Sequence, residues 1–476
     1  MDKGLTRQFV AAFIGSLSVM AAGCSYGWVT PLLSQFHSPD SPIPLTHVES
    51  SWAVALIEFG NLFTSIPAGL LVNRWGRKSL LLATAPVYVM SWLCIVTIKS
   101  VTSLYIARTI QGLAMGVIYT VLPVYLAEIG SQDVRGALTT FFEAMWYTGI
   151  LMEYILGPHL SFTSFTLVTC SVPIVFFVTF ICIPDSPYYY LMQGDQVKAA
   201  DSLIWLRATA DIEEELYSMK KTIEEEREQN RSWKNSVVTR ANVKALMIVE
   251  IVVLTKFMSG IAAVLSYSSD MFASTGSTFT ADNSTIIMGV LLLLTTIFAG
   301  ALVDKVGRRP LLLISCFGCC ITEFISGLFC FLHTNFAMDL SPYSWVFMTS
   351  VMIYCVIFSL GLGPLTNTLK GELFPSFTKG FGSGLTTMTD TISCFVCLKM
   401  YQVVTDSYGI YLNFWIFSSF SLMGFMLIYL LVPETKGKTF IEIQQMLNDS
   451  KDVSVNTTLQ YDFEAETQQC STEEEA

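Results

Sequence analysis

A lysine stands inside one of the most apolar stretches of the chain. Lys256 opens the segment KFMSGIAAVLSY, which is embedded in a long hydrophobic run. An ammonium group is expensive in the hydrocarbon core of a bilayer, so an ionisable residue at such a position marks a functional site and needs a partner. The chemistry available to it is electrostatic: it can bind a polar solute or hold a carboxylate.

A second set of charged residues occurs twice. GLLVNRWGRKSLLL at 69–82 returns as GALVDKVGRRPLLL at 300–313, and PDSP at 184–187 is matched by PETK at 433–436. This order indicates an internal duplication whose repeated loops face the same side. Parallel repeats of this kind are typical of transporters, which bind substrate near the middle of the membrane between the halves.

Each half also carries an acidic and a basic residue seven positions apart, Glu128 with Arg135 and Glu372 with Lys379. Charged residues at helix ends can form an ion-pair network that latches the inner side while the outer side is open. Single exposed ion pairs are weak, but a network that breaks on rocking can bias two states separated by a few kcal/mol. One such loop is explained by membrane topology alone, whereas its repetition favours a latch.

The composition requires a membrane protein. Only 14% of the 476 residues are charged and the mean hydropathy is +0.54, whereas soluble domains average about 25% charged residues. Apolar runs of about 20 residues, which can span hydrocarbon as helices, recur about twelve times. They lie near 9–33, 49–72, 79–98, 102–127, 137–158, 162–183, 243–272, 284–303, 310–332, 342–369, 381–404 and 410–432. The pattern predicts an all-α integral membrane protein with twelve transmembrane helices in two six-helix bundles.

Other classes have no support in the sequence. There is no nucleophile paired with a base, no metal-ligand cluster and no basic stripe. We therefore expect neither an enzyme nor a cofactor, metal or nucleic-acid partner. The lipid bilayer and a small-molecule substrate are the expected partners, and no obligatory protein partner is predicted.

Lysine and arginine crowd the loops on one side, which the positive-inside rule places, with both termini, in the cytoplasm. The segment that joins the halves is charged, helix-favouring and free of proline, so we expect cytoplasmic helices there. The predicted parts are an amino-terminal bundle at 1–183, a helical linker at 184–240, a carboxy-terminal bundle at 241–447 and an acidic, disordered cytoplasmic tail at 448–476.

Several motifs together resemble the sugar porter family of the major facilitator superfamily. They are NRWGRK (73–78), ARTIQGLAMG (107–116), PVYLAEI (123–129), RGAL (135–138), PDSP (184–187), SGI (259–261), DKVGRR (304–309), GELFP (371–375) and VPETKGKTF (432–440), in family order from the second span to the twelfth. The chain is similar to animal facilitative hexose carriers and insect trehalose-type carriers. The resemblance implies the major facilitator fold and movement of a sugar by alternating access.

The resemblance also implies residue roles. The residues expected to act in gating are Arg74, Gly76, Arg77, Arg108, Glu128, Arg135, Asp304, Gly307, Arg308, Glu372, Lys379 and Glu434. The residues expected to line the substrate site are Glu143, Lys256, Phe257, Ser259, Tyr267, Asn367 and Asp390.

The predicted substrate site departs from the family pattern. The seventh span of the family usually reads Q-Q-x-S-G-I-N, with Gln and Asn side chains on the sugar hydroxyls, but here Lys256-Phe257-Met258 precedes SGI and Ala262 follows it. Asn367 stands where the tenth span usually carries Trp. Each unsatisfied polar group in a dry site costs about 1–3 kcal/mol, so other groups have to replace the missing amides.

We expect Lys256 to line the central cavity and to pair with Glu143, because both occupy family positions that face the sugar from different helices. Asp390 and Glu250 are rival partners. The first span, AAGCSYGWVTP at 21–31, has no acid, whereas proton-coupled sugar porters often carry Asp there. Facilitation is therefore favoured over symport.

These expectations lead to one predicted function and two alternatives. The first is facilitative transport of a hexose or a trehalose-like sugar across the plasma membrane. The second keeps the fold but moves a charged or modified sugar, or another small solute, bound through Lys256 and Glu143. The third is a receptor-like protein that no longer transports. Asn283 begins a sequon on the predicted outer side and is the expected glycosylation site.

Overall fold

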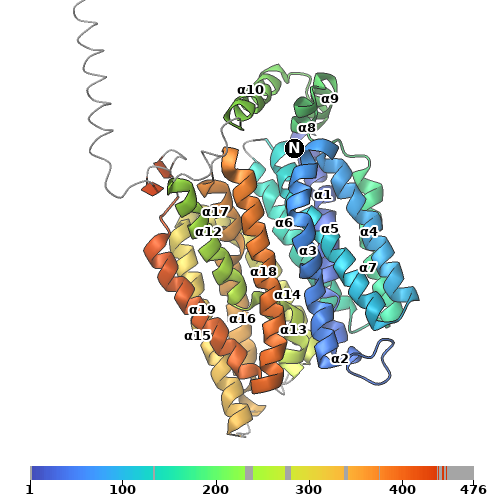
Figure 1. Ribbon diagram of the computed structural model, residues 1–476, viewed down its shortest axis with the longest axis vertical. Coiled ribbons are helices and arrows are strands. Elements are labelled where there is room, and N and C mark those ends of the chain that lie inside the picture. Colours follow the sequence, from blue (N-terminus) through green and yellow to red (C-terminus); the bar gives the residue numbers. More distant parts are fainter. Residues whose placement is uncertain are drawn as a thin grey trace, which may run out of the picture.

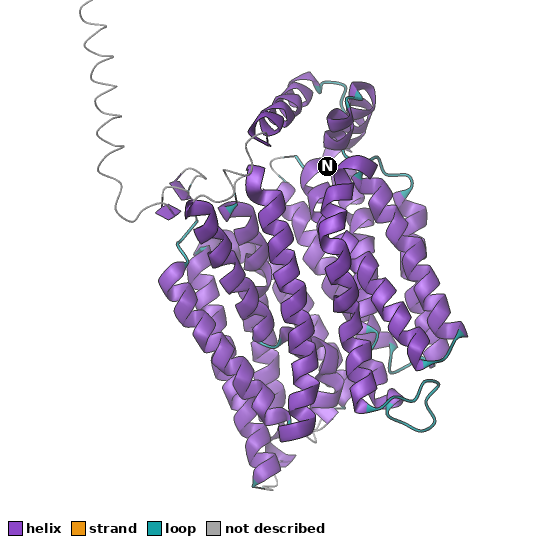
Figure 2. Cartoon of the chain, viewed as in Figure 1, coloured by secondary structure: helices purple, strands orange, loops and turns teal. Residues whose placement is uncertain are grey.

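The computed structural model describes residues 3–131, 134–230, 240–273, 280–336, 341–374 and 376–436, together with short pieces of the segment that follows. Within these ranges every regular element is a helix (Figure 2). The predicted tail at 448–476 lies outside the described residues. So do the side chains of Arg135, Asp304 and Lys379, although their backbone belongs to described helices.

The first six spans form one group of packed helices (Figure 1). They are α1 (Lys3–Gly27), which continues through the 3-10 turn η1 (Thr30–Leu32) into α2 (Leu33–Phe36), then α3 (His47–Trp75), α4 (Arg77–Thr97), α5 (Val101–Ile129), α6 (Arg135–Leu156) and α7 (Phe162–Phe180). Helix α5 packs against α3 and α4, and α1 packs against α6 and α7.

The last six spans form a second group beside the first (Figure 1). They are α12 (Arg240–Met258) with α13 (Ile261–Ala273), α14 (Ala281–Val306), α15 (Arg308–Asn335), the turn η2 (Ser341–Tyr343) with α16 (Ser344–Leu360) and α17 (Leu362–Leu373), α18 (Ser376–Tyr408) and α19 (Ile410–Leu431). The two groups meet mainly where α18 packs against α3 and where α14 packs against α6.

Ten of these described spans are long and apolar enough to cross a membrane by length and composition. The other two, α6 and α18, run alongside them (Figure 1) and carry ionisable residues within their length, among them Glu143 and Glu153 in α6 and Asp390 and Lys399 in α18. The prediction of twelve spanning helices is therefore confirmed. The two less apolar helices lie at the contacts between the two groups.

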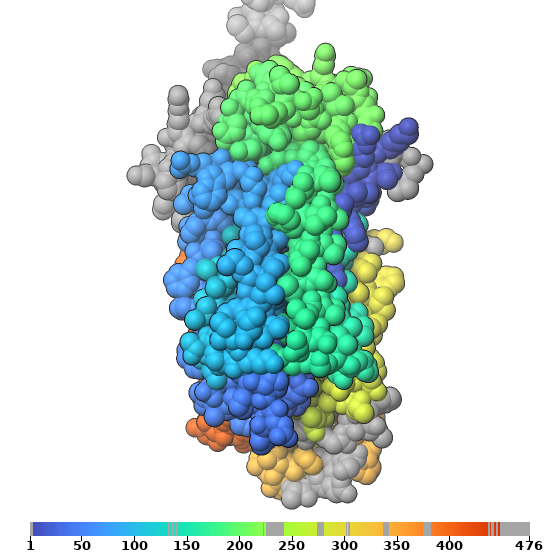
Figure 3. Space-filling view, turned by 90° about the vertical axis from the view of Figure 1, so that its right-hand side faces the viewer, coloured from blue at the N-terminus to red at the C-terminus, as the bar shows by residue number. Residues whose placement is uncertain are grey.

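In the part of the linker that the structure describes, three further helices follow the first group: α8 (Pro187–Gln193), α9 (Gln196–Arg207) and α10 (Glu213–Asn230). They sit over one end of the bundle, where Figure 3 shows them in green above the amino-terminal group. We call this end the linker end, and the opposite end, where α2 lies (Figure 1), the distal end. Buried Leu203, Ile212 and Met219 give the linker helices a small apolar core of their own.

Two glycines set the repeated turns at the linker end. Gly76 joins α3 to α4 with φ +87°, and Gly307 joins α14 to α15 with φ +107°. Residues with a side chain rarely adopt such angles. A Cβ at Gly76 would also meet the side chains of Asp185 and Tyr189, and a Cβ at Gly307 would meet Glu434.

Those two acidic residues cap the helices that follow the glycines. Asp185 Oδ1 accepts a hydrogen bond from the backbone N–H of Lys78 at 3.1 Å. Glu434 accepts from the backbone N–H groups of Arg308 and Arg309, both at 3.0 Å. A carboxylate at a helix amino terminus satisfies orphan N–H groups and complements the helix dipole. The motifs PDSP and PETK thus do the same structural work in both halves.

We predict that Glu434→Gln lowers the free energy of unfolding by about 1 kcal/mol, the usual cost of losing a cap, because the neutral amide is a weaker acceptor for two backbone donors. The exposed Glu224→Gln in α10 is the matched control and should leave it unchanged. Thermal unfolding of the purified protein in detergent measures both, and equal midpoints for the two variants would contradict the capping role.

The cap also has a pH dependence of known sign. Partial burial alone would raise the pKa of Glu434, but the backbone N–H groups of Arg308, Arg309, Thr435 and Lys436 outweigh it and hold the pKa below its usual range. The contribution of Glu434 is therefore present above its ordinary pKa near 4.5 and is lost as the pH falls through the lowered value. The difference in unfolding free energy between wild type and Glu434→Gln should therefore shrink as the pH falls through the lowered pKa of Glu434.

Candidate functional site

Two spans of the carboxy-terminal group are broken in the membrane. Gly260, at φ +85°, separates α12 from α13, and Gly361 separates α16 from α17. Such breaks free backbone polar groups, which need partners inside the protein. Ser259 Oγ donates to the carbonyl of Lys256 at 2.8 Å, and Tyr354 OH donates to the carbonyl of Ser259 at 2.8 Å. Ser259 is fully buried and braces the break.

A polar bridge joins the two groups of helices near these breaks. Asn367 of α17 donates through Nδ2 to Glu143 Oε1 of α6 at 2.9 Å. Asn367 is nevertheless exposed. A side chain that reaches across to the other group and stays accessible lies in an opening between them. Both residues come from the predicted substrate set, and the structure brings them together.

An ion pair extends this bridge. Lys370 Nζ lies 2.6 Å from Asp390 Oδ2 and links α17 to α18. Asn367 and Lys370 are one helical turn apart and therefore share a face of α17. Asp390 was predicted from the sequence, but Lys370 was missed; its i, i+3 spacing from Asn367 could have revealed it.

Lys256 is placed beside this cluster but is not paired with it. Its Nζ donates a long bond of 3.4 Å to the carbonyl of Gly363 and lies 5.4 Å from the centre of the Phe257 ring. The predicted direct ion pair between Lys256 and Glu143 is not formed among the described side chains, so that prediction is wrong. Glu143 accepts a hydrogen bond from Asn367 instead.

The last predicted substrate residue, Tyr267, lies in the core. It is buried, and its ring stacks on Tyr401 with 4.7 Å between ring centres. Its hydroxyl has no hydrogen-bond partner among the described residues. Glu143, Lys256, Asn367 and Asp390 are thus grouped with Lys370, while Tyr267 packs against α18.

The ion pairs expected to form a latch lie within each half. Arg77 pairs with Glu128 at 2.6 Å, and Arg308 pairs with Glu372 at 2.9 Å. Thr435 donates to Glu372 at 2.6 Å. The described members of the predicted network therefore fasten helices of the same half to one another. The predicted network also includes Arg135 and Lys379, whose side chains lie outside the described residues, so the latch as a whole stays a prediction.

The remaining gating candidates occupy different places. Arg74 is exposed at the linker end. Arg108 is buried in the distal part of α5, where Nε donates to the carbonyl of Ala53 at 2.9 Å and Nη1 donates to Gln111 Oε1 at 3.2 Å and to the carbonyl of Ser25. It lies 20 residues, about 30 Å of helix, from Glu128, so it does not belong to the same ion-pair set. Asn283 is exposed at the distal start of α14.

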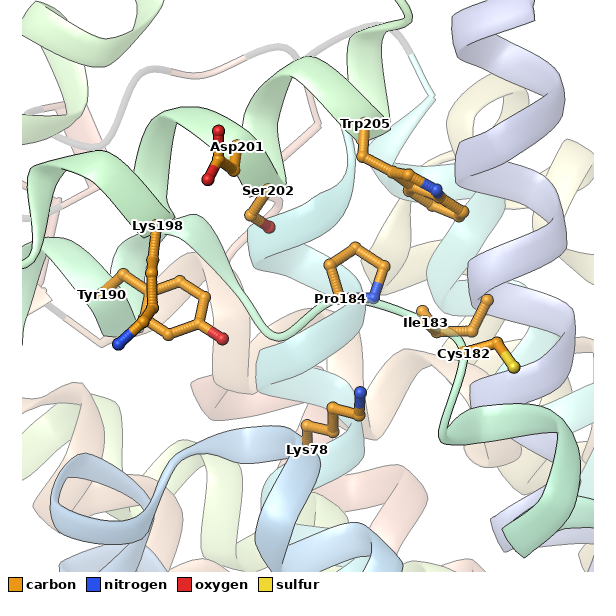
Figure 4. A pocket seen from close by; sticks show the side chains of 9 residues that line it. All are labelled: Lys78, Cys182, Ile183, Pro184, Tyr190, Lys198, Asp201, Ser202 and Trp205. Carbon is orange, nitrogen blue, oxygen red and sulfur yellow. The ribbon is translucent and has the colours of Figure 1, made fainter.

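A cavity of about 290 Å³ lies at the linker end, where α9 approaches the start of α4 (Figure 4). Its two lysines are engaged, because Lys78 Nζ donates to the carbonyl of Ile181 at 2.7 Å and Lys198 pairs with Asp195 at 2.8 Å. The lining residues are Lys78, Cys182, Ile183, Pro184, Tyr190, Lys198, Asp201, Ser202 and Trp205. None of them belongs to the polar cluster between the halves, so this cavity is separate from that cluster.

Two six-helix groups with broken helices and a polar cluster between them form the architecture of a secondary transporter. The chain belongs to the family described as sugar (and other) transporters, whose model matches residues 6–447. It is 31% identical over 443 residues to a facilitated trehalose transporter of Apis mellifera ligustica, covering 92% of this chain and 88% of that protein. It is equally identical to the one of Anopheles gambiae, of whose length it spans only 56%.

Solved structures show the same fold. The proton:xylose symporter XylE bound to 6-bromo-6-deoxy-D-glucose matches with a TM-score of 0.73 at 21% identity, covering 94% of this chain and 99% of that one. The inward open conformation of XylE from E. coli matches with a TM-score of 0.74 at 21% identity, covering 93% and 99%. The chain therefore has the major facilitator fold.

We predict that Lys370→Met destabilises the protein by about 2 kcal/mol, because it removes the charged hydrogen-bond partner of a half-buried carboxylate. Adding Asp390→Leu should restore much of the loss, since replacing both members of a buried pair by apolar residues is often neutral. Thermal unfolding of the two single variants and the double variant measures this. A double variant as unstable as the sum of the single variants would show that the pair does not couple.

Proposed function

We propose that the protein is a facilitative carrier of a hexose or trehalose-like sugar in the plasma membrane and performs no covalent chemistry. The observation that carries the proposal is the accessible Glu143–Asn367 bond between the two helix groups. Membership of the sugar transporter family and the similarity to facilitated trehalose transporters support it. A neutral polyol needs hydrogen bonds that can be remade as the carrier changes shape, and this bond can exchange for bonds to substrate.

The polar cluster has the donors and acceptors that a sugar requires. Glu143 accepts, Asn367 donates and accepts, and Lys256 donates. Hydrogen bonds to an ionised group are roughly twice as strong as neutral ones. One carboxylate and one ammonium can therefore replace several of the amides that the family usually places here.

The two helix groups act, in this proposal, as the bundles at 1–183 and 241–447 that rock about the cluster. The linker end is the cytoplasmic end, because the basic loops at 73–78 and 304–309 lie there, and loops rich in Lys and Arg stay inside. Both termini are then cytoplasmic. The distal end, with Asn283, faces outward.

The alternative substrate is a sugar or small solute that carries an anionic group. The observation that favours it is the position of Lys256, whose ammonium has a carbonyl and a ring but no carboxylate within ion-pair distance among the described side chains. A carboxylate on the substrate would supply the ion-pair partner of Lys256. The two candidates differ in one measurable property, the charge of the solute that moves.

The deciding experiment is uptake into proteoliposomes of labelled glucose, fructose, trehalose, a sugar acid and an amino sugar, with and without a pH gradient. We expect saturable uptake of a neutral sugar that ignores the gradient. Uptake of the sugar acid alone would establish the second candidate. If folded protein takes up none of these solutes, the result would support the third alternative, a receptor-like protein that no longer transports.

Variants of the cluster sharpen the result. Glu143→Gln and Lys256→Met should each lower kcat/KM for the transported sugar about tenfold or more, the effect of losing one charge-assisted hydrogen bond. The matched control is Glu153→Gln, on the same helix but about 15 Å away, where the carboxylate accepts from Thr169 inside the amino-terminal half. Equal losses in the control and in Glu143→Gln would contradict the assignment of the site.

A further inference from the structure

The ion pairs Arg77–Glu128 and Arg308–Glu372 lie at the linker end, each within one half, so closure of the distal end depends on other contacts. Helices α3 and α18 supply an extended contact between the halves and lie side by side in Figure 1. Near their distal ends α18 carries Lys399, a cation within a membrane-spanning helix. An ammonium group at such a position is costly, so it needs a partner within the protein.

Lys399 is bound to α3 by two interactions. Its Nζ donates to Ser51 Oγ at 2.7 Å, and it lies 4.1 Å from the centre of the Trp52 ring. One turn earlier on α18, Phe395 lies 6.3 Å from Trp52 and 6.4 Å from Phe59, measured between ring centres. The two helices are therefore joined by a cation and an aromatic cluster.

The arrangement differs from that of a lysine that only reaches for water. A snorkelling side chain directs its charged end to the interface and away from neighbouring helices. Lys399 instead reaches across to the other half, and no carboxylate pairs with it among the described side chains. A cation over an aromatic ring gains strength when water is excluded. Entry of water between α3 and α18 would weaken the contact and rehydrate the ammonium.

We propose that Lys399 is a positioning residue that holds the distal gate closed by binding Ser51 and Trp52, and that releases when the carrier opens to the outside. The proposal rests on alternating access, as set out in the proposed function. In this structure the distal gate is closed, since Thr30 of η1 also donates to the carbonyl of Leu265 in α13 at 3.1 Å.

A native thiol reports on this gate. Cys394 is 3% exposed, and its Sγ lies 3.8 Å from the hydroxyl of Tyr26 in the other half. It is on the same helix as Lys399, five residues toward the linker end. A reagent that enters from outside can reach Cys394 only after the distal ends of α3 and α18 separate.

The experiment measures the rate at which a membrane-impermeant maleimide added outside modifies Cys394 in the full-length protein in cells, with mass spectrometry of the Cys394 peptide as readout. Lys399→Met should raise the rate about tenfold, the population shift expected from losing a cation–π contact and a charged hydrogen bond together. Trp52→Leu should act in the same direction. The double variant should add little to either, because the two residues share one interaction.

Two controls separate the gate from general packing. Lys399→Arg keeps a cation that can bind the ring and the hydroxyl, so its rate should stay near that of wild type. Lys99→Met removes the exposed lysine that follows α4 at the distal end and should change nothing. An unchanged rate in folded Lys399→Met and Trp52→Leu, or an equal rise in Lys399→Arg, would overturn the proposal. The measurement needs no sugar, so its outcome is independent of whether the proposed substrate is correct.

Discussion

The structure depends on one constraint: a charge or a free backbone group inside the membrane needs a partner within the protein. Arg108 meets it with carbonyl and amide oxygens, since its guanidinium donates to Ala53, Ser25 and Gln111 rather than to a carboxylate. Lys370 meets it with Asp390. The positions of these partners decide which helices are tied together and, as a consequence, which surfaces are left to move.

The internal duplication shows how the same constraint was met twice. In each half a glycine with positive φ turns the chain, and a carboxylate from the distant P-D-S or P-E-T motif caps the next helix. In each half an arginine next to that glycine pairs with a glutamate. Thr435, one position after the capping Glu434, donates a hydrogen bond to Glu372, and Ser186 stands at the matching position after Asp185. The repetition extends from sequence letters to individual hydrogen bonds.

The sequence was sufficient for the fold and for much of the site, and its failures have a common cause. Apolar runs and repeated motifs predicted twelve helices in two groups, and the divergent positions led to Glu143, Asn367 and Asp390. The partner of Glu143 was wrong because Lys256, Asn367 and Lys370 all face the same region from helices whose register a sequence does not give. A sequence shows directly which residues of one helix lie three or four positions apart and therefore share a face. The choice among polar groups that meet across a seam between distant segments depends on sub-turn rotations of whole helices.

The distribution of bond strengths explains why such a protein can move without unfolding. Inside the halves, arginine–glutamate pairs and carboxylate caps join helices firmly. Between the halves, the polar contacts include single hydrogen bonds such as Thr30 to the carbonyl of Leu265 and Asn367 to Glu143. A hydrogen bond contributes about 0.5–1.5 kcal/mol net, so a handful of them sums to a few kcal/mol. That is the scale of the free energy that separates two interconverting conformations. Bonds of this size can be exchanged for water at one end and for substrate in the middle, whereas the stronger interactions within each half keep it a rigid body.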